Sequence, residues 1–500
     1  MESLEDIRIA KVANIAGVYG NASIRPSHRS NMISNLLDEE NFTALTESNS
    51  EVEVHGRIYS KRGKGKIIFL DVYDQSGKIQ VFLEVATLGE EAFENLKTTL
   101  DMGDIVEVRG TMFRTPAGEI TVKATHFAIL TKCVLPPPIG KTKDGEHLFA
   151  LVDTEQRYRQ RYLHLMAVPE DRELFIDRSK IIAFIRRFFE SYDFIEIETP
   201  MLQGLQGGAT ARPFITHANA LDQDMFLRIA PELYLKRALV AGFERIYEIG
   251  KNFRNEGIDT THSPEFTMLE AYWTYANYKD MEMLVEMLVG RLMAMFNFPN
   301  VEEAFGRVDY LAAFDKIAEH FNHFGPSVSE MFNMEETAQL DAIRVFAEAV
   351  GVETGKDESF CKIVDSIFKK HVVKGDFFGE HPFFVEHHPV AISPLAKRCK
   401  DNPQLTERFQ MIWGRVELVN GFSENCDPFD QRKRFEEQHK DDEFMPLDED
   451  FLTALKFGMP PSAGVGLGVN RIVMLLTHQE NIRDVELFPT MRVKGNNENE

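Results

Sequence analysis

The sequence predicts an α+β protein in which a small β-barrel precedes a larger domain of mixed strands and helices. The first observation is an alternation of apolar and polar side chains in five short segments of residues 51–130, separated by turn clusters. The second is the proline run Pro136-Pro137-Pro138, which is typical of a stiff linker. The third is that the strands and helices after this run do not alternate as βαβ units, which argues against a doubly wound sheet.

The composition excludes several classes of protein. The chain has 500 residues, which is room for about two to four domains, and 43% of them are apolar, enough to build packed cores. Its 79 acidic and 56 basic residues give a net charge of −23, which argues against a protein that coats nucleic acid but says nothing about a local basic surface. No apolar run is long enough to span a bilayer, so we expect no membrane association.

The termini and the cysteines bear on the compartment. Residues 1–6 lack the basic and apolar parts of a secretory signal. The four cysteines show no CxxC spacing, so neither a disulfide framework nor a zinc site is indicated: Cys133, Cys361, Cys399 and Cys426. Both observations suit a reducing compartment, and we expect a cytoplasmic protein.

Four segments follow from these patterns. Residues 1–50 are weakly patterned, residues 51–135 form the barrel domain, residues 136–160 form a proline-rich linker, and residues 161–500 form the large domain. Inside the large domain, residues 300–380 lack a chemical motif and look like an insertion. We expect the strands of an antiparallel barrel at residues 51–58, 67–72, 78–84, 104–113 and 119–130, with turns at 74–77 and 115–118.

The large domain mixes helical and strand periods along its length. Its Met-rich helix has a methionine stripe that we interpret as core packing rather than a binding groove. The expected elements, in order, are a helix at 179–192, a strand at 196–200 that ends at Pro200, strands at 246–253 and 266–275, the Met-rich helix at 280–296, and a glycine-rich strand at 464–468 that leads into an apolar helix.

The polar loop after Phe253 carries side chains suited to a nucleotide. Arg254 offers a planar fork for phosphate oxygens, and Glu256 can accept a hydrogen bond from an exocyclic amine. His262 can donate to a phosphate, and Phe266 presents a π face to a base. Taken alone, this loop is slightly better explained as a solvated turn beside a core phenylalanine.

A second arginine strengthens the nucleotide interpretation. Arg471 follows the glycines of Gly464-Val465-Gly466-Leu467-Gly468, and glycines let a ligand approach the backbone closely. Two arginines near one nucleotide would offset the charge of a phosphoryl group during its transfer.

Several motifs together resemble the class II aminoacyl-tRNA synthetases. Arg254-Asn255-Glu256, within residues 253–266, resembles motif 2, residues 464–471 resemble motif 3, and residues 196–202 resemble motif 1, the dimer-forming element. The chain is more narrowly similar to class II lysyl-tRNA synthetases in six further segments: residues 158–163, 207–214, 230–234, 262–272, 393–396 and 420–424. The resemblance covers roughly residues 50–490 in order. It implies an OB-type anticodon-binding barrel, a catalytic domain built on an antiparallel sheet flanked by helices, and a homodimer.

The resemblance also implies a reaction. The enzyme would activate L-lysine with ATP to give lysyl-adenylate and pyrophosphate, and would then transfer lysine to the 3′ end of tRNA(Lys). By resemblance, Arg254 and Arg471 are the catalytic residues: Arg254 contacts the α-phosphate, and Arg471 with His262 holds the γ-phosphate of a bent ATP. Glu256 would contact the adenine amine, and Phe266 would stack on the adenine ring against Arg471.

A lysine pocket needs carboxylates that replace the hydration of an ammonium group. Glu270 stands in an apolar strand, where a lone acid is costly unless it is paired. By resemblance, Glu270 and Glu424 would hold the side-chain ammonium, and Glu232 with the Gly208 backbone would hold the α-amino group. The remaining lysine-binding candidates are Tyr272, Asn420 and Phe422.

Magnesium is where the chain departs from the family that it resembles. The family usually binds magnesium through two acids seven positions apart. Glu417 matches the second acid, but the first falls on Gln410, whose carbonyl oxygen can coordinate a hard cation without adding charge. We therefore expect Glu417 to bind magnesium and a weaker site where Gln410 stands.

The barrel segment is locally basic although the chain is acidic. Five basic residues stand between Glu53 and Asp71 with no acid among them, as in a surface that follows a nucleic-acid backbone: Arg57, Lys61, Arg62, Lys64 and Lys66. By resemblance, Arg62, Gln80 and Glu119 would read the central uridine of the anticodon. Phe69 would stack on an anticodon base, or would simply belong to the barrel core.

Three alternatives share part of this pattern. An aspartyl- or asparaginyl-tRNA synthetase would want basic residues in place of Glu270 and Glu424. A lysyl-transferring paralogue that modifies an elongation factor would lack the barrel. A non-catalytic nucleic-acid-binding relative would have lost Arg254 or Arg471, and only Gln410 favours it.

Overall fold

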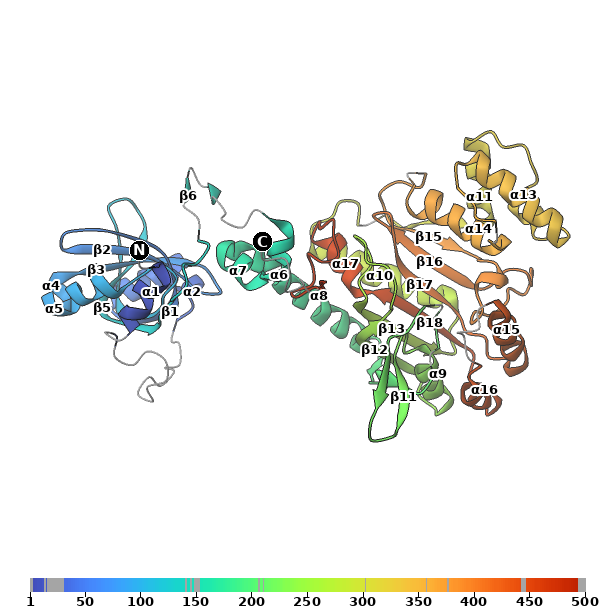
Figure 1. The fold of residues 1–500 in the computed structure, drawn as a ribbon, viewed down its shortest axis with the longest axis horizontal. Coiled ribbons are helices and arrows are strands. Elements are labelled where there is room, and N and C mark those ends of the chain that lie inside the picture. The colour runs from blue at the N-terminus through green and yellow to red at the C-terminus, as the bar shows by residue number, and fades with distance from the viewer. Residues whose placement is uncertain are drawn as a thin grey trace. The chain divides into compact units, whose positions relative to one another are not determined.

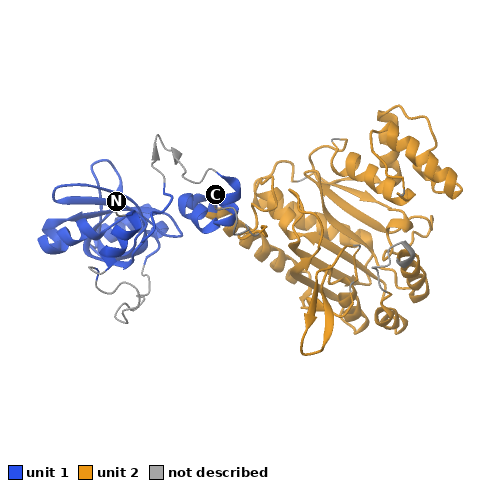
Figure 2. Cartoon of the chain, in the orientation of Figure 1, with its two compact units in different colours: residues 1–171 blue, residues 172–500 orange. Residues whose placement is uncertain are grey.

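The structure, a computed structural model, consists of two compact units, residues 1–171 and residues 172–500 (Figure 2). It describes residues 3–12, 15, 31–139, 142–143, 146–147, 153–205, 207–209, 211–301, 303–356, 358–375, 377–441 and 447–492. The segments expected at residues 1–50 and 136–160 therefore lie partly outside the described residues. Among the helices that are described, none has the length and apolar character needed to cross a membrane.

A closed five-stranded barrel dominates the first unit. Around the barrel the strands are β1 (Glu51–Lys64), β2 (Ile67–Tyr73), β3 (Lys78–Glu84), β5 (Ile120–Thr131) and β4 (Ile105–Arg114). The expected antiparallel barrel needs one correction, because β3 and β5 pair in parallel. The reason is the connection after β3, which runs through helices α4 (Val85–Leu88) and α5 (Glu90–Thr99), so that β5 rather than β4 lies beside β3.

The period-two pattern of the barrel strands produces its core. Val54, Leu70 and Val81 are fully buried in the barrel core, and most of their sequence neighbours are partly exposed, although Gln80 beside Val81 is also buried. The remaining elements of this unit are short: α1 (Leu4–Val12), α2 (Ile33–Leu37), α3 (Glu39–Glu47), β6 (Thr142–Lys143), β7 (Glu146–His147), α6 (Thr154–Arg159), α7 (Arg161–Ala167) and the 3₁₀ turn η1 (Pro169–Asp171).

An eight-stranded sheet forms the centre of the second unit (Figure 1). Neighbouring strands are antiparallel except in the pairs β14–β15 and β12–β8. In spatial order the strands are β14 (Gly306–Asp309), β15 (Phe383–Glu386), β16 (Arg408–Trp413), β17 (Val416–Ser423), β18 (Ser462–Gly468), β13 (Glu265–Thr274), β12 (Arg245–Phe253) and β8 (Ile195–Glu196).

The expected strand at 196–200 is mostly wrong. Only Ile195–Glu196 pairs as β8, and Ile197 adds one further hydrogen bond to the carbonyl of Tyr247. Pro200 has no N–H to continue such a ladder, and the chain leaves the sheet before it. The strands expected at 246–253 and 266–275 are confirmed as β12 and β13.

Helices α8 (Arg172–Ser191) and α10 (Tyr278–Met295) contribute buried residues to the core on one side of the sheet, together with α17 (Val469–Leu476). Helix α10 begins at a capping box between Asn277 and Asp280. Its methionine stripe is only partly core packing, because Met281 and Met293 are buried whereas Met283 and two others are exposed.

Residues 306–373 build a helical subdomain, which Figure 1 shows beyond β15, and its core also includes Val385 and Ile412 of the sheet. Its elements are α11 (Tyr310–His320), α12 (Val328–Met331), α13 (Glu336–Ala349), α14 (Phe360–Phe368) and the π-helical turn η2 (Lys369–Val373). The other elements of this unit are β9 (Leu202–Gln203), β10 (Ile215–Ala218), β11 (Gln223–Leu227), α9 (Glu232–Val240), η3 (Val390–Ile392), α15 (Pro428–Asp441) and α16 (Glu449–Lys456).

Candidate active site

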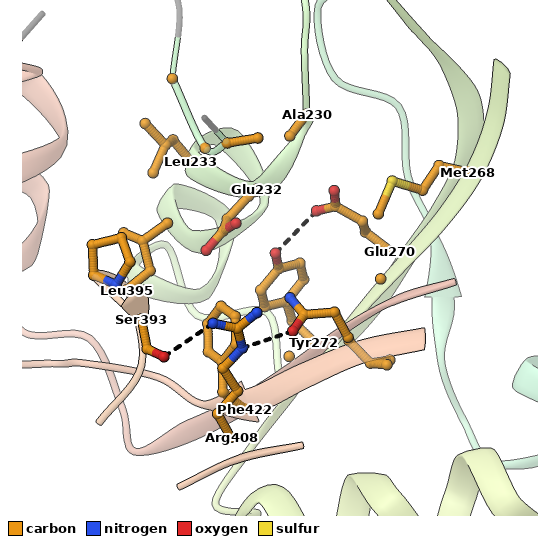
Figure 3. A pocket seen from close by; sticks show the side chains of 18 of the residues that line it. Ala230, Glu232, Leu233, Met268, Glu270, Tyr272, Ser393, Leu395, Arg408 and Phe422 are labelled. Carbon is orange, nitrogen blue, oxygen red and sulfur yellow. Dashed lines mark hydrogen bonds between the residues drawn. The ribbon is translucent and has the colours of Figure 1, made fainter. Parts of the chain in front are cut away.

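A cavity of about 230 Å³ lies on the sheet face opposite the α8–α10 core (Figure 3). Strands β13, β17 and β18 form its floor, and the start of α9 and the segment 392–395 form its walls. It is lined by six of the seven residues that the sequence assigned to lysine binding: Gly208, Glu232, Glu270, Tyr272, Asn420 and Phe422.

Glycines make room for this cavity. A Cβ atom at Gly464 would lie 2.5 Å from the Tyr272 ring, and one at Gly466 would lie 2.4 Å from Met268. Gly208 has φ +87°, a conformation that side-chain-bearing residues rarely adopt, and a Cβ there would press on Glu232. The glycines of β18 therefore leave space for Tyr272 and Met268, which line the cavity with them.

Two carboxyl groups face the cavity from different elements. Glu232 opens α9, and Glu270 lies on β13, where it accepts a hydrogen bond from the Tyr272 hydroxyl at 3.0 Å. Burial and the neighbouring Glu232 raise the pKa of Glu270 to about 8. The site therefore contains an acid that is poised to ionise when a cation binds.

The third expected carboxylate, Glu424, lies behind the cavity wall. It is 1% exposed, and its Oε2 forms an ion pair with Lys236 at 2.5 Å. Lys236 also donates to Glu232 at 2.6 Å, and its ammonium group stands 5.4 Å from the centre of the Phe422 ring. Burial opposes the charge on Lys236, but the two carboxylates outweigh it and raise its pKa.

Sequence reasoning missed Lys236 and Arg408. Lys236 had a usable signal, because Glu232 and Lys236 have the i,i+4 spacing of helical ion pairs. Arg408 lines the cavity and donates to Asn420 Oδ1 at 2.9 Å and to Ser393 Oγ at 3.0 Å (Figure 3). Only the register of β16 on β17 places it there.

A second cavity of about 260 Å³ adjoins the first and collects the residues expected to bind ATP. Its lining includes Arg254, Glu256, His262, Phe266 and Arg471. The guanidinium of Arg254 stands over the Phe266 ring at 5.2 Å, and burial lowers the pKa of Arg254.

His262 and Arg471 touch directly, with Arg471 Nη2 3.1 Å from His262 Nε2. The other ring nitrogen of His262 lies 2.9 Å from the carboxylate of Asp259. Partial burial disfavours ionisation of Asp259, but hydrogen bonds from Thr261 and His262 prevail and lower its pKa to about 2. Asp259, which the sequence did not indicate, therefore orients His262.

The two cavities share the residues Arg254, Met268, Asn420 and Gly466. Ligands in the two cavities would meet beside Arg254, a cation. Such an arrangement can bring a carboxylate and a phosphate together and offset their charge.

The residues considered for magnesium form a hydrogen-bonded chain. His388 Nε2 lies 3.1 Å from Gln410 Oε1, and Gln410 Nε2 donates to Glu417 Oε2 at 3.0 Å. Burial lowers the pKa of His388 well below its usual value, so the ring is neutral. The Gln410 carbonyl is therefore occupied by His388 and its amide N–H faces Glu417, so Glu417 fits a cation and Gln410 does not.

On the barrel, three of the residues expected to bind the anticodon lie on the neighbouring strands β1, β2 and β3, and the fourth, Glu119, directly precedes β5. Gln80 Nε2 donates to Glu119 at 2.9 Å, and Arg62 donates to Asp71, the cross-strand partner of Gln80, at 3.1 Å. Phe69 is half-buried and lies outside the barrel core, with its ring centre 5.0 Å from that of Phe82. The core alternative for Phe69 is therefore wrong.

Each of the two units matches a known protein family. A profile described as tRNA synthetases class II (D, K and N) matches residues 153–492, and a profile described as OB-fold nucleic acid binding domain matches residues 52–130. The chain is 43% identical over 470 residues to the lysine–tRNA ligase of Haemophilus influenzae strain PittGG, covering 92% of this chain and 91% of the relative.

Two further lysine–tRNA ligases are similar to the chain over most of its length. The heat-inducible lysine–tRNA ligase of Escherichia coli K12 is 41% identical over 489 residues, which is 95% of this chain and 93% of that protein. The lysine–tRNA ligase of Mannheimia succiniciproducens is 43% identical over 474 residues, which is 92% and 91% of the two chains. The chain therefore belongs to the lysine–tRNA ligases within the class II tRNA synthetases.

Proposed function

We propose that the two adjoining cavities activate L-lysine with ATP and that the same unit then charges tRNA(Lys). The observation that carries the proposal is the pairing of a carboxyl-lined cavity with an arginine-lined one across shared walls. A carboxyl-lined cavity suits a diamino acid and repels aspartate, so the geometry supports lysine over the acidic substrate of a sister enzyme.

In the first step, the lysine carboxylate oxygen attacks the α-phosphorus of ATP, and the bond to the β-phosphate oxygen breaks as pyrophosphate leaves with the electron pair. Glu270 and Tyr272 hold the side-chain ammonium, with Glu424 and Lys236 behind them, and Glu232 with the Gly208 backbone holds the α-amino group. Arg254 offsets charge at the α-phosphate, and Arg471 with His262 holds the far phosphates. Glu256 and Phe266 bind the adenine.

In the second step, a hydroxyl oxygen of the terminal ribose of tRNA attacks the carbonyl carbon of lysyl-adenylate. The ester C–O bond forms, the bond from carbon to the phosphate oxygen breaks, and AMP leaves with the electron pair. The hydroxyl proton passes to the departing phosphate. No enzyme side chain becomes covalently attached to lysine.

We propose that Glu417 is the one residue of the pair Gln410 and Glu417 that would bind magnesium. A bound cation would neutralise phosphate charge. Glu417 presents an ionisable carboxylate, whereas the hydrogen bonds of Gln410 direct its amide nitrogen toward Glu417. The chain therefore holds one acidic ligand where the family pattern has two.

We further propose a cytoplasmic homodimer. The segment that resembles the dimer-forming motif, residues 196–202, exposes the large apolar side chains of Met201 and Leu202, and Ile195 and Leu205 on either side of it are also exposed. All four cysteines are free thiols, in keeping with a reducing compartment. The barrel binds the anticodon through Arg62, Phe69, Gln80 and Glu119.

Amino-acid-dependent ATP–pyrophosphate exchange tests the function. We expect exchange with lysine and none with aspartate or asparagine, and charging of tRNA(Lys) by the full chain. Exchange with aspartate or asparagine in place of lysine, or no exchange at all, would refute the proposal.

A further inference from the structure

Two half-buried side chains, Arg178 and Glu486, stand behind the nucleotide cavity. Arg178 lies on α8, and Glu486 lies in the segment that follows α17. Neither residue lines the cavity, but each is hydrogen-bonded to side chains that do. These lining residues come from three places in the chain: Ser263 before β13, Thr267 on β13 and Asn470 at the start of α17.

The buried amide of Asn470 is held at both ends. Its Oδ1 accepts a hydrogen bond from Arg178 Nη2 at 2.8 Å, and its Nδ2 donates to Glu486 Oε1 at 2.8 Å. An arginine can only donate and a carboxylate can only accept, so the two partners select one orientation of the amide. Asn470 is 2% exposed, and a buried amide without partners would be costly. Arg178 and Glu486 therefore hold the start of α17, where Arg471 is the next residue.

The same two side chains also hold the segment around the start of β13. Ser263 Oγ donates to Glu486 Oε2 at 3.3 Å, and Arg178 Nη2 donates to Thr267 Oγ1 at 3.1 Å. Ser263 immediately follows His262 in the chain. The loop that carries His262 is therefore held by the same pair of side chains as the start of α17.

Backbone contacts reinforce this link. Arg178 Nη1 donates to the carbonyl of Val485 at 3.3 Å, and the N–H of Ile482 donates to the carbonyl of Thr260 at 2.8 Å. Residues 482–486 are thereby joined both to α8 and to the loop before β13. Burial lowers the pKa of Arg178, and nearby Glu486 opposes that shift, so the two groups stabilise each other's charged forms.

We infer that Arg178 and Glu486 are positioning residues for ATP, which hold His262 and Arg471 in contact with each other. The inference rests on the proposed function, in which His262 and Arg471 bind the far phosphates. Arg471 Nη2 lies 3.1 Å from His262 Nε2, although the two residues belong to segments far apart in the chain. Their contact therefore depends on the groups that hold both segments, and phosphoryl transfer depends on such positioning.

Glu486→Ala and Glu486→Gln in the full-length protein test the inference. Alanine removes both acceptor oxygens, whereas glutamine can still accept from Asn470 and donate to Ser263. In lysine-dependent exchange, Glu486→Ala should raise the KM for ATP about tenfold, the effect of losing hydrogen bonds to a charged group, and leave the KM for lysine unchanged. Glu486→Gln should restore the KM for ATP. The control is Glu480→Ala, at an exposed position outside the cavity lining, which should leave both constants unchanged.

Arg178→Met supplies an independent test, because it removes the donor on the other side of Asn470. It should also raise the KM for ATP. Combined with Glu486→Ala, it should raise that KM by less than the product of the two single effects, since both side chains act through the same amide. A merely structural role would lower the free energy of unfolding and the active fraction of each variant without changing the KM for ATP.

Binding of ATP and of AMP, each measured without lysine, locates the effect on the nucleotide. Glu486→Ala and Arg178→Met should weaken ATP binding and leave AMP binding unchanged, because AMP lacks the far phosphates. An unchanged KM for ATP in both variants would overturn the inference, as would equal weakening of ATP and AMP. Absence of lysine-dependent exchange in the wild type would instead refute the proposed function, and the comparison of ATP with AMP would still test the positioning of His262 and Arg471.

Discussion

Lys236 Nζ lies 2.6 Å from Glu232 Oε1, so a lysine of the chain itself is held by an acid that faces the cavity proposed to bind the substrate lysine. The same ammonium group pairs with Glu424, and neither Lys236 nor Glu424 lines the cavity. Three carboxyl groups share one internal cation, and burial raises the pKa of two of them, Glu270 and Glu424, to about 8. The positive charge of a bound diamino acid can therefore favour the ionised form of Glu270, which faces the cavity.

Lys236→Met should destabilise the protein strongly. The methionine has a similar length but no charge, so Glu232 and Glu424 would lose their buried counter-ion, at a cost of about 3–5 kcal/mol. Urea unfolding should show this loss, and saturating L-lysine should recover part of it by binding the uncompensated acids. Lys236→Arg, which keeps the charge, serves as the control and should lose less. Equal stability of Lys236→Met and the wild type would contradict the expectation.

Lysine binding should release a proton at neutral pH. With a pKa of about 8, raised by burial and by Glu232, Glu270 is protonated at pH 7 in the free protein. A bound ammonium favours the carboxylate, so binding lowers that pKa, and lysine affinity should rise as the pH rises towards 8. Calorimetry at pH 7 in buffers of different ionisation enthalpy would detect the released proton. A binding enthalpy that does not depend on the buffer would exclude this linkage.

Gln410→Glu should lower the magnesium requirement. The new carboxylate would stand beside Glu417 without the amide N–H that now faces it, and two adjacent carboxylates attract a hard cation. Exchange measured against magnesium concentration should shift to lower values, and Mn²⁺ binding followed by electron paramagnetic resonance should tighten. Gln404→Glu, at an exposed position, makes the same charge change as a control. Superimposable magnesium curves would disprove the prediction.

Phe69→Ala should impair charging without affecting activation. Loss of a base-stacking ring typically costs 1–3 kcal/mol, so the charging efficiency, kcat/KM for tRNA(Lys), should fall roughly tenfold. Lysine-dependent exchange should not change, because the barrel is a separate unit. Phe69→Leu keeps an apolar contact with Phe82 but no π face, so it should resemble Phe69→Ala; wild-type charging by Phe69→Leu would mean that the ring only packs.

Local sequence patterns were sufficient to predict many of the strands and site residues of this protein. Strands β12 and β13 follow from hydrophobic periodicity, because side chains alternate with period two wherever one face is buried. Glu270 stood out as an acid in an apolar strand, and Arg254 and Arg471 stood out through their spacing around glycine-rich and polar segments. These motifs consist of residues a few positions apart in the chain, so the sequence alone was enough to identify them. It therefore determined the family, its substrates and the segments that supply most of the lining of the two cavities.

Contacts between distant segments were decided only by the tertiary structure. The α4–α5 connection makes β3 a parallel partner of β5, and sheet register pairs Arg408 with Phe422, from where its side chain reaches Asn420. Lys236 on α9 meets Glu424 on the segment after β17, and Tyr310 on α11 stacks on Phe368 at the end of α14. Each of these pairings depends on how elements far apart in the chain pack together, and the free energy that selects such packing comes from burial of the whole core rather than from any local run of residues.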